Sequence, residues 1–173
     1  HYVLLAYRHG LSSPLATLVE DSQGLSLDRF GGVIVVRAER QDLNTLSDLR
    51  GQRLATSAVS SLGSYQLQAY ALLQAGIRLP EDARIVETGQ PQDLAIDAVV
   101  RGDADVAFVR TGLVESLRAE GKIMPDALKV IAPQHNPGFP LLHSTALYPE
   151  WALAAMSGVN QDLARQLAAA MLA

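Results

Sequence analysis

Apolar and polar residues alternate in a regular rhythm over the middle of the chain. The run VIVV at 33–36 follows a glycine pair, and continuous β-branched residues of this kind are typical of a strand buried on both faces. A capped helical turn is expected at 45–49, ended by Gly51. Beyond it the pattern predicts strands at 53–57, 84–87, 104–109 and 128–132 and helices at 65–75, 92–101 and 112–120. Strands that alternate with helices of about ten residues indicate βαβ units in a parallel sheet.

The two ends of the chain are less regular. Apolar runs at 2–7 and 15–19 predict two strands with a turn between them. The segment 133–140 is expected to be a hinge loop, followed by a strand at 141–148 and an amphipathic helix at 161–172. No apolar run approaches the ~20 residues that span a bilayer, and we expect no signal peptide in the first residues given. The sequence begins abruptly, and we expect it to be a piece of a longer protein.

Composition narrows the class of protein. Hydrophobic residues make up 49% and charged residues 18% of the 173 residues, which indicates a packed domain rather than a disordered chain. The net charge of −4 argues against a nucleic-acid binder, which normally has a basic face. The chain has no cysteine, which excludes a disulfide scaffold, a thiolate metal site and a cysteine nucleophile.

The motif SSLGSY at 60–65 is the strongest local signal for a binding site. It places hydroxyl residues and a glycine where a predicted strand turns into a helix. Backbone N–H groups and the helix dipole at such a junction favour a bound anion. A plain N-cap serine in a tight turn would use the same residues, so both interpretations stay open.

Two further junctions have the same character. The motif TGQP at 88–91 and the motif RTG at 110–112 also follow predicted strands. In a parallel sheet these carboxyl ends share one edge, which is where ligands of open α/β sheets bind. Arg110 is a candidate cation for that site, or else a surface arginine at a strand end.

Signals for catalysis are weak. The four histidines have neither metal-ligand spacing nor an HExxH motif, and no G-x-S-x-G, P-loop or G-x-G-x-x-G motif is present. His143, beside Ser144 and Thr145, is a candidate pocket residue, although a packed and hydrogen-bonded histidine fits the pattern equally well. We expect no cofactor and no metal, and an enzyme has no support from these residues.

Several motifs together resemble a known family. The segments FGGVIVVR at 30–37, LSDLRGQRLA at 46–55 and GDADVA at 102–107 are similar to the type II periplasmic binding fold in its phosphonate-binding branch. SLGSY at 61–65 resembles the serine- and glycine-rich helix start that contacts the ligand in that branch. The segment 88–93 resembles one that usually carries His-Asp before a helix. Gln92 stands in place of that histidine, and Ser64 in place of a usual second glycine.

Two other stretches narrow the resemblance. The segments 108–115 and 139–151 are similar to the sensor domains of membrane histidine kinases of the tetrathionate-sensor type. The resemblance implies an α/β, two-lobed periplasmic-binding-protein-like (type II) fold, with one lobe complete and the other truncated. The complete α/β lobe is expected at 37–133, and 1–36 with 134–173 would form parts of the N-terminally truncated second lobe. Apolar surface exposed by the truncation would favour a homodimer.

The implied function is an extracytoplasmic ligand-sensing domain of a two-component sensor histidine kinase. It would lie in the periplasm, in a membrane-anchored parent protein, and bind a small anionic solute, an oxyanion, in an inter-lobe cleft. The alternatives are a free solute-binding protein of an ABC transporter of the phosphonate or oxyanion class, and a small α/β enzyme. The expected ligand-binding residues are Ser60, Ser61, Gly63, Ser64, Tyr65, Thr88, Gly89, Gln90, Gln92, Asp93, Arg110, Thr111, His143, Ser144 and Thr145.

Overall fold

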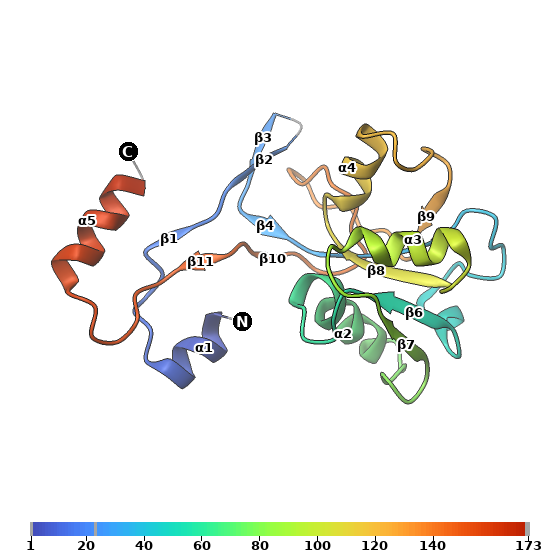
Figure 1. Ribbon diagram of the computed structural model, residues 1–173, viewed down its shortest axis with the longest axis horizontal. Helices are drawn as coiled ribbons and strands as arrows, with labels where there is room; N and C mark the ends of the chain where they lie inside the picture. The colour runs from blue at the N-terminus through green and yellow to red at the C-terminus, as the bar shows by residue number, and fades with distance from the viewer. Residues whose placement is uncertain (1, 23, 172–173) are drawn as a thin grey trace. The chain divides into compact units, whose positions relative to one another are not determined.

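The computed structural model describes residues 2–22 and 24–171, and the chain divides into two compact units. One unit is the continuous segment Phe30–Leu147 (Figure 1). The other combines the two ends of the chain, His1–Arg29 and Tyr148–Ala173. The described helices do not include any with the length and hydropathy that a bilayer crossing requires.

A five-stranded mixed sheet forms the centre of the unit Phe30–Leu147. Its strands, in the spatial order β7-β6-β8-β5-β9, are β5 (Gly32–Arg37), β6 (Arg53–Thr56), β7 (Arg84–Glu87), β8 (Val106–Arg110) and β9 (Leu128–Val130). Strand β6 runs parallel to both β7 and β8, as the sequence pattern predicts. Strand β5, however, is antiparallel to both of its neighbours, so the prediction of a wholly parallel sheet is wrong.

The connection that follows β5 differs from the helical crossovers that join the parallel strands β6, β7 and β8. A parallel neighbour needs a long crossover, usually through a helix that covers the sheet. Between β5 and β6 the chain forms only the short 3-10 helix η1 (Leu46–Leu49), in which the Asp48 carboxylate accepts hydrogen bonds from the amides of Asn44 and Thr45. The apolar run of β5 indicates burial on both faces, but it carries no information about strand direction.

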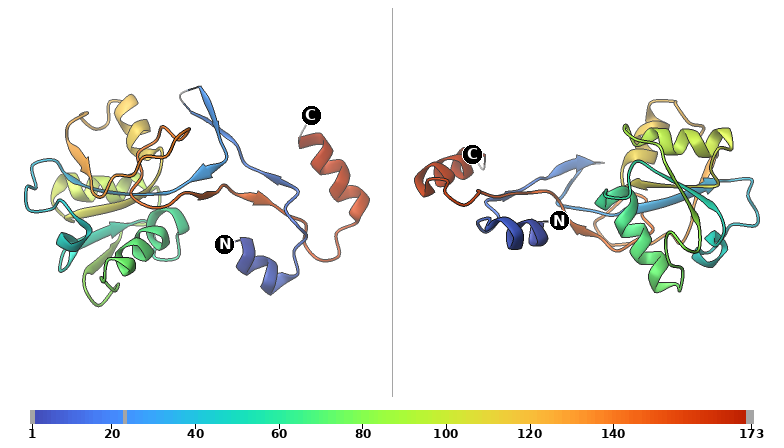
Figure 2. Two further views of the ribbon diagram at one scale, coloured as in Figure 1. Left: turned by 180° about the vertical axis from the view of Figure 1, so that it is seen from behind. Right: turned by 60° about the horizontal axis from the view of Figure 1, so that its bottom comes forward.

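Helices cover both faces of this sheet (Figures 1 and 2). Helix α2 (Leu67–Gln74) lies on one face, and helices α3 (Asp93–Arg101) and α4 (Leu113–Ala119) lie on the other. Side chains of β5 alternate between the two resulting cores: Val33 and Val35 pack with α3 and α4, whereas Ile34 and Val36 pack with α2. This alternation explains why the strand reads as one unbroken apolar run.

The predicted lobe 37–133 lies entirely within this unit. The unit also contains the segment 134–147 and the strand β5. Strand β5 pairs with both β8 and β9, so the sheet is incomplete without it. The division of the chain into lobes at residues 37 and 133 stays a prediction.

The other unit consists of short elements. They are α1 (Tyr2–His9), β1 (Ala16–Thr17), β2 (Glu20–Ser22), β3 (Leu25–Leu27), β4 (Arg29–Phe30), β10 (Tyr148–Pro149), β11 (Ala152–Leu153) and α5 (Gln161–Met171), with β4 and β10 at the two passages of the chain between units. Strand β1 pairs with β11, β2 with β3, and β4 with β10. The predicted helix 161–172 is confirmed as α5, and its last residue, Leu172, lies outside the described residues.

Two predictions for the irregular segments are wrong. Residues 2–7 form helix α1 rather than a strand, with Arg8 and His9 in its last turn and Gly10 at a positive φ of 61° after it. Basic residues and a left-handed glycine favour a helix C-terminus, and a short apolar run does not by itself distinguish the two structures. The predicted strand 141–148 is irregular up to Tyr148, and the hydroxyls of Ser144 and Thr145 within it accept hydrogen bonds from amides of β5.

Candidate functional site

Three polar junctions lie at one edge of the sheet in the unit Phe30–Leu147. Parallel strands β6, β7 and β8 end at this edge, and antiparallel β5 begins there. The edge therefore carries residues 57–64 after β6, 88–93 after β7, Arg110 and Thr111 at the end of β8, and Phe30 and Gly31 before β5. We call these residues the ligand edge. The expectation that the three junctions share an edge is confirmed for these strands.

The serine-rich junction begins with a widened helical turn. The segment η2 (Leu62–Gln66) is a π-helix that continues into α2, and the amide of Gln66 donates to the carbonyl of Ser61 at 3.0 Å. Ser61 caps this helix, since its Oγ accepts a hydrogen bond from the Ser64 amide at 3.4 Å. Ser61 is therefore the N-cap of this helix, as one of the two interpretations of the sequence predicts. The first N–H groups of the helix still lack partners within the helix itself, as at any helix N-terminus.

The hydroxyls of this junction differ in their surroundings. Ser64 is buried and its Oγ lies 2.7 Å from the Oγ of Ser57, while the hydroxyl of Thr56 donates to the Ser64 carbonyl. Ser60 is exposed and Ser61 is half-buried. Ser60 and Ser61 therefore remain accessible, whereas Ser64 supports the turn from inside.

Arg110 contacts three elements of the ligand edge. Its amide donates to the side-chain Oε1 of Gln92 at 3.1 Å, and its guanidinium carbon lies 4.5 Å from the centre of the Phe30 ring. An added Cβ on Gly63 would lie 3.3 Å from the Phe30 ring and 3.4 Å from the side chain of Arg110, so only a glycine allows this approach without adjustment. Gly63, Gln92, Arg110 and Phe30 thus form one contiguous cluster, with a cation stacked on an aromatic ring.

The junction after β7 extends this cluster. The amide of Thr88 donates to the Thr56 carbonyl at 2.8 Å, and the amide of Gly89 donates to the Ser57 carbonyl at 3.1 Å. Gly89 and Gln90 are exposed. Asp93 is the first residue of α3, and its Oδ1 is buried and accepts no hydrogen bond from the described part of the chain.

Charge is distributed unevenly along the ligand edge. Burial raises the pKa of Tyr65, and the carboxylates of Glu81 and Glu87 raise it further. The cation of Arg110 lies on the side of Gly63 and Phe30. Among the residues of the ligand edge, the charged side chains are those of Arg110 and Asp93.

The hydroxyls of Thr111, Ser144 and Thr145 accept hydrogen bonds from backbone amides at the start of β5. The amide of Gly31 donates to Thr111 Oγ1, the amide of Gly32 to Thr145 Oγ1, and the amide of Ile34 to Ser144 Oγ, at 3.3, 2.9 and 3.0 Å. Thr111, Ser144 and Thr145 are all buried in the same unit as Arg110. Their hydroxyls consequently act as structural acceptors for the first residues of this strand.

His143 is packed inside the unit. It is 1% exposed, its Nδ1–H donates to the Leu141 carbonyl at 2.9 Å, and its Nε2 accepts from the Asn136 amide group at 2.7 Å. The ring also meets Phe139 edge-on, with centroids 5.2 Å apart. These contacts fit the packed-histidine interpretation of the sequence, in which His143 supports the loop 136–141 rather than lining a pocket.

Sequence reasoning missed Phe30, Ser57 and Gln68. Ser57 directly follows β6 and Phe30 directly precedes a glycine pair, so their positions along the chain were a signal. Gln68 had no such signal, because it occupies an ordinary helical position and only the packing of α2 on the sheet buries it.

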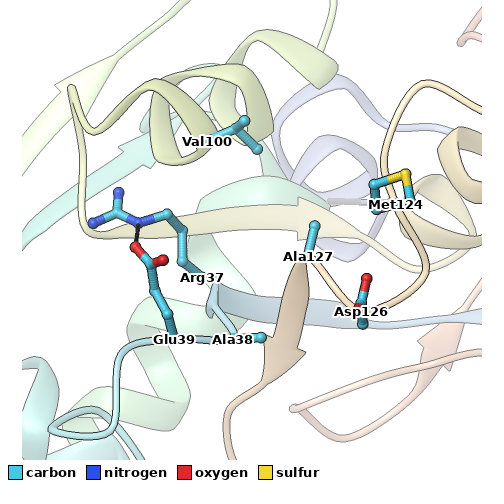
Figure 3. Close-up of a pocket in the computed structure, with 7 residues that line it drawn as sticks. All are labelled: Arg37, Ala38, Glu39, Val100, Met124, Asp126 and Ala127. Atoms are coloured by element: carbon cyan, nitrogen blue, oxygen red, sulfur yellow. Dashed lines mark hydrogen bonds and ion pairs between the residues drawn. The ribbon is translucent and has the colours of Figure 1, made fainter.

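A groove of about 370 Å³ lies at the opposite edge of the sheet (Figure 3). It is lined by Arg37, Ala38, Glu39, Val100, Met124, Asp126 and Ala127. The guanidinium of Arg37 pairs there with the Glu39 carboxylate at 3.0 Å (Figure 3). None of the predicted ligand residues lines this groove. Over residues 2–22 and 24–171, no group of three or more side chains is placed to hold a metal ion.

Sequence comparison identifies the family to which this fold belongs. The whole chain, residues 1–173, matches the family described as ABC transporter, phosphonate, periplasmic substrate-binding protein, and it belongs to that family. The predicted resemblance to the phosphonate-binding branch is confirmed.

One similar protein is a sensor histidine kinase. The chain is 28% identical over 157 residues to the tetrathionate sensor histidine kinase TtrS of Salmonella typhimurium, a match that covers 91% of this chain and 26% of that kinase. The predicted similarity to tetrathionate-type sensors is confirmed. The chain therefore spans about a quarter of the kinase.

Solved structures share the fold. XAC2383 from Xanthomonas citri, solved bound to ATP, superposes with a TM-score of 0.73 at 22% identity and covers 99% of this chain and 60% of that one. The binding-protein component of an ABC phosphonate transporter from Pseudomonas aeruginosa gives a TM-score of 0.57 at 15% identity, covering 82% and 44%. The α/β periplasmic-binding-protein fold is thus confirmed. The chain's share of these structures is consistent with a truncated lobe.

Proposed function

We propose that this chain is the extracytoplasmic ligand-sensing domain of a two-component sensor histidine kinase, anchored in the membrane through its parent protein and located in the periplasm. The match with TtrS over 91% of the chain carries the proposal. Membership in a periplasmic binding family supports the same location and a small-molecule ligand. The domain itself would bind rather than catalyse.

The ligand we propose is a small oxyanion held at the ligand edge. The helix start at Ser61 supplies N–H groups and the positive end of the dipole, and Arg110 supplies a guanidinium with a geometry suited to oxyanions. Gln92 holds the Arg110 amide through its Oε1. Thr88, Gly89 and Gln90 would form the rim, while Thr111, His143, Ser144 and Thr145 would act indirectly by fixing β5.

Signalling would follow from closure of two lobes over the solute. A ligand shifts a conformational equilibrium only as far as it binds the two states with different affinity. An anion that contacts both lobes binds the closed state better, and the resulting change of lobe angle would pass to the kinase. A homodimer of the sensing domain would be the receiving assembly.

The first test is a thermal-shift screen of the complete extracytoplasmic region of the parent protein against sulfate, thiosulfate, tetrathionate, phosphate, methylphosphonate and acetate. A ligand at 100 times its dissociation constant stabilises the folded state by about 2.7 kcal/mol, which gives a clear rise in Tm. The proposal predicts a rise for at least one oxyanion and none for uncharged sugars. A folded protein that responds to sugars or amino acids, and to no oxyanion, would contradict it.

A free solute-binding protein of an ABC transporter is the second candidate. The family match and the Pseudomonas aeruginosa structure favour it. Autophosphorylation of the purified parent protein in membranes separates the two: ligand-dependent phosphate transfer from ATP would establish the sensor. A parent protein without a kinase region, encoded beside a transporter, would establish the carrier.

A further inference from the structure

A fully buried glutamine lies directly beneath the ligand edge. Gln68, in the first turn of α2, is 0% exposed. Its Nε2 donates to the carbonyls of Gly63 at 2.8 Å and Val109 at 2.9 Å, and lies 3.4 Å from that of Val33. One amide group therefore links the helix start, the end of β8 and the beginning of β5.

The glycine before Val33 makes room for this amide. An added Cβ on Gly32 would lie 2.5 Å from both Cδ and Nε2 of Gln68, which is closer than side-chain atoms pack. The φ of Gly32 is not in the positive range, so a glycine is needed at position 32 for space and not for backbone conformation. Gly32, the first residue of β5, thus has a specific packing role for Gln68.

The amide also accounts for the widened turn that opens the helix. The amides of Gln66 and Leu67 both donate to carbonyls five residues earlier, those of Ser61 and Leu62. Single π-turns of this kind are uncommon and occur often at functional sites. The Gln68 side chain binds the next carbonyl, that of Gly63, and so stabilises the turn at its end.

We propose that Gln68 is a positioning residue for the ligand edge, because its amide fixes the serine turn relative to Arg110; this inference rests on the proposed function. Gly63 directly precedes Ser64, and Val109 directly precedes Arg110. A single side chain bonded to both carbonyls sets the separation of the helix N–H groups and the guanidinium. That separation decides which oxyanion fits.

The unused oxygen of the amide strengthens the inference. Oε1 of Gln68 is buried and accepts no hydrogen bond from the described residues. A buried acceptor without a partner lowers stability, whereas methionine would fill similar space without that penalty. The two short hydrogen bonds that Nε2 donates therefore point to a role in placing the turn more than to a gain in stability.

The first experiment needs no ligand. Amide hydrogen exchange is measured on the wild-type chain, on Gln68→Met, and on Leu72→Ala as a control that weakens the same helix from its buried side. In Gln68→Met we expect the amides of Gln66, Leu67 and Arg110 to exchange about tenfold faster relative to Val35 in the sheet core. Leu72→Ala should leave that ratio unchanged. An unchanged ratio in Gln68→Met would overturn the proposal.

Binding provides the readout that a merely structural role would not change. Dissociation constants for sulfate, phosphate and tetrathionate are measured by calorimetry at a temperature where each variant is fully folded. Gln68→Met should weaken the best of these anions about tenfold, while Leu72→Ala, with a comparable loss of Tm, should stay within about twofold of wild type. Equal affinity in Gln68→Met and wild type would overturn the positioning role. A wild type that binds none of the three contradicts the proposed function, and the exchange result still decides the role of Gln68.

The space around Gly32 gives an independent check. Gly32→Ala should displace the Gln68 amide and accelerate the same three amides, because its Cβ occupies the amide's position. In the double variant Gly32→Ala with Gln68→Ala, the smaller side chain at 68 removes the clash. The two substitutions should therefore be less harmful together than the sum of their separate effects, and strict additivity would contradict the packing argument.

Discussion

The two edges of the central sheet, at opposite ends of its strands, differ in the chemistry of their side chains. At the edge opposite the ligand edge, the Asp105 carboxylate accepts hydrogen bonds from the backbone amide, Nε and Nη2 of Arg53 and from Nη1 of Arg40, all at 2.9–3.0 Å. At the ligand edge, the Arg110 backbone amide bonds to Gln92 and its guanidinium stacks on the Phe30 ring, beside the helix start at Ser61. The first edge joins β5, β6 and β8 by charge, and the second is the place of the proposed anion site.

The motifs that define the family resemblance fall on both edges. The segment GDADVA at 102–107 contains Asp105, directly before β8, and the segment LSDLRGQRLA at 46–55 contains Arg53. Their side chains pair with one another, so these motifs contribute to the fold. SLGSY at 61–65 lies at the ligand edge. Resemblance to a family therefore does not by itself show which of its motifs contact the ligand.

The largest effect is expected at the helix start. Ser61→Asp keeps an oxygen that can cap the Ser64 amide, but it places a negative charge where the anion would bind. We expect affinity for the best oxyanion to fall at least ~100-fold with little change in Tm. Ser61→Asn has nearly the same shape without the charge and should retain most of the binding. Equal affinities for the two variants, measured by calorimetry, would remove this helix start from the site.

The opposite edge should respond in stability alone. Asp105→Asn removes the carboxylate that pairs with Arg53 and Arg40, and we expect a loss of about 2 kcal/mol in the free energy of unfolding because charge-assisted hydrogen bonds are lost. Asp103→Asn is the matched control, since its pair with Arg101 is solvent-exposed and worth little. Denaturant unfolding measures both. A comparable loss in the control, or an altered anion affinity in Asp105→Asn, would break the comparison of the two edges.

Acid should weaken the same edge. Hydrogen bonds from Arg53 hold the pKa of Asp105 well below its ordinary value of 3.8. Because the folded-state pKa is depressed, the stabilisation is fully present above the unfolded-state pKa and is lost as the pH falls through the folded-state pKa. We expect Tm to decline below about pH 5, and Asp105→Asn to flatten that decline. Parallel curves for wild type and variant from pH 7 to pH 2 would contradict this assignment.

The smallest predicted effect concerns charge selectivity. Arg110→Ala should weaken a doubly charged oxyanion about tenfold and a singly charged one less, because the guanidinium contributes charge-assisted hydrogen bonds. Arg101→Ala, an exposed arginine at the opposite edge, serves as its control. Competition calorimetry with sulfate and acetate compares the two ligands. Equal losses for both anions would mean that Arg110 only shapes the site.

The hydrophobic pattern was sufficient to predict the architecture around the ligand edge. The predictions of β5 from its continuous β-branched residues, and of α3 and α5 from their helical periodicity, were correct because buried positions are occupied by apolar residues. The direction of β5 and the helical state of 2–7 left no comparable trace in residue type. Strand direction depends on the connection that leads from one strand to the next. A short apolar run fits either a strand or a helix.

Site prediction was limited by long-range contacts. Ser144 and Thr145 look like ligand contacts in the sequence, yet their hydroxyls bond to amides of β5 that lie 110 and 113 residues away. Gln68 looks like a surface helical residue, yet it binds carbonyls of two strands. Only tertiary packing decides whether a polar side chain remains available to a ligand.

The most direct test of the central claim follows backbone amide signals of the 173-residue chain by NMR during titration with sulfate, phosphate and tetrathionate. The account predicts saturable shifts at Gly63, Ser64 and Arg110 and unchanged signals at Arg53 and Asp105. Shifts confined to Arg53, Asp105 or the groove beside Arg37, with none at the ligand edge, would contradict it.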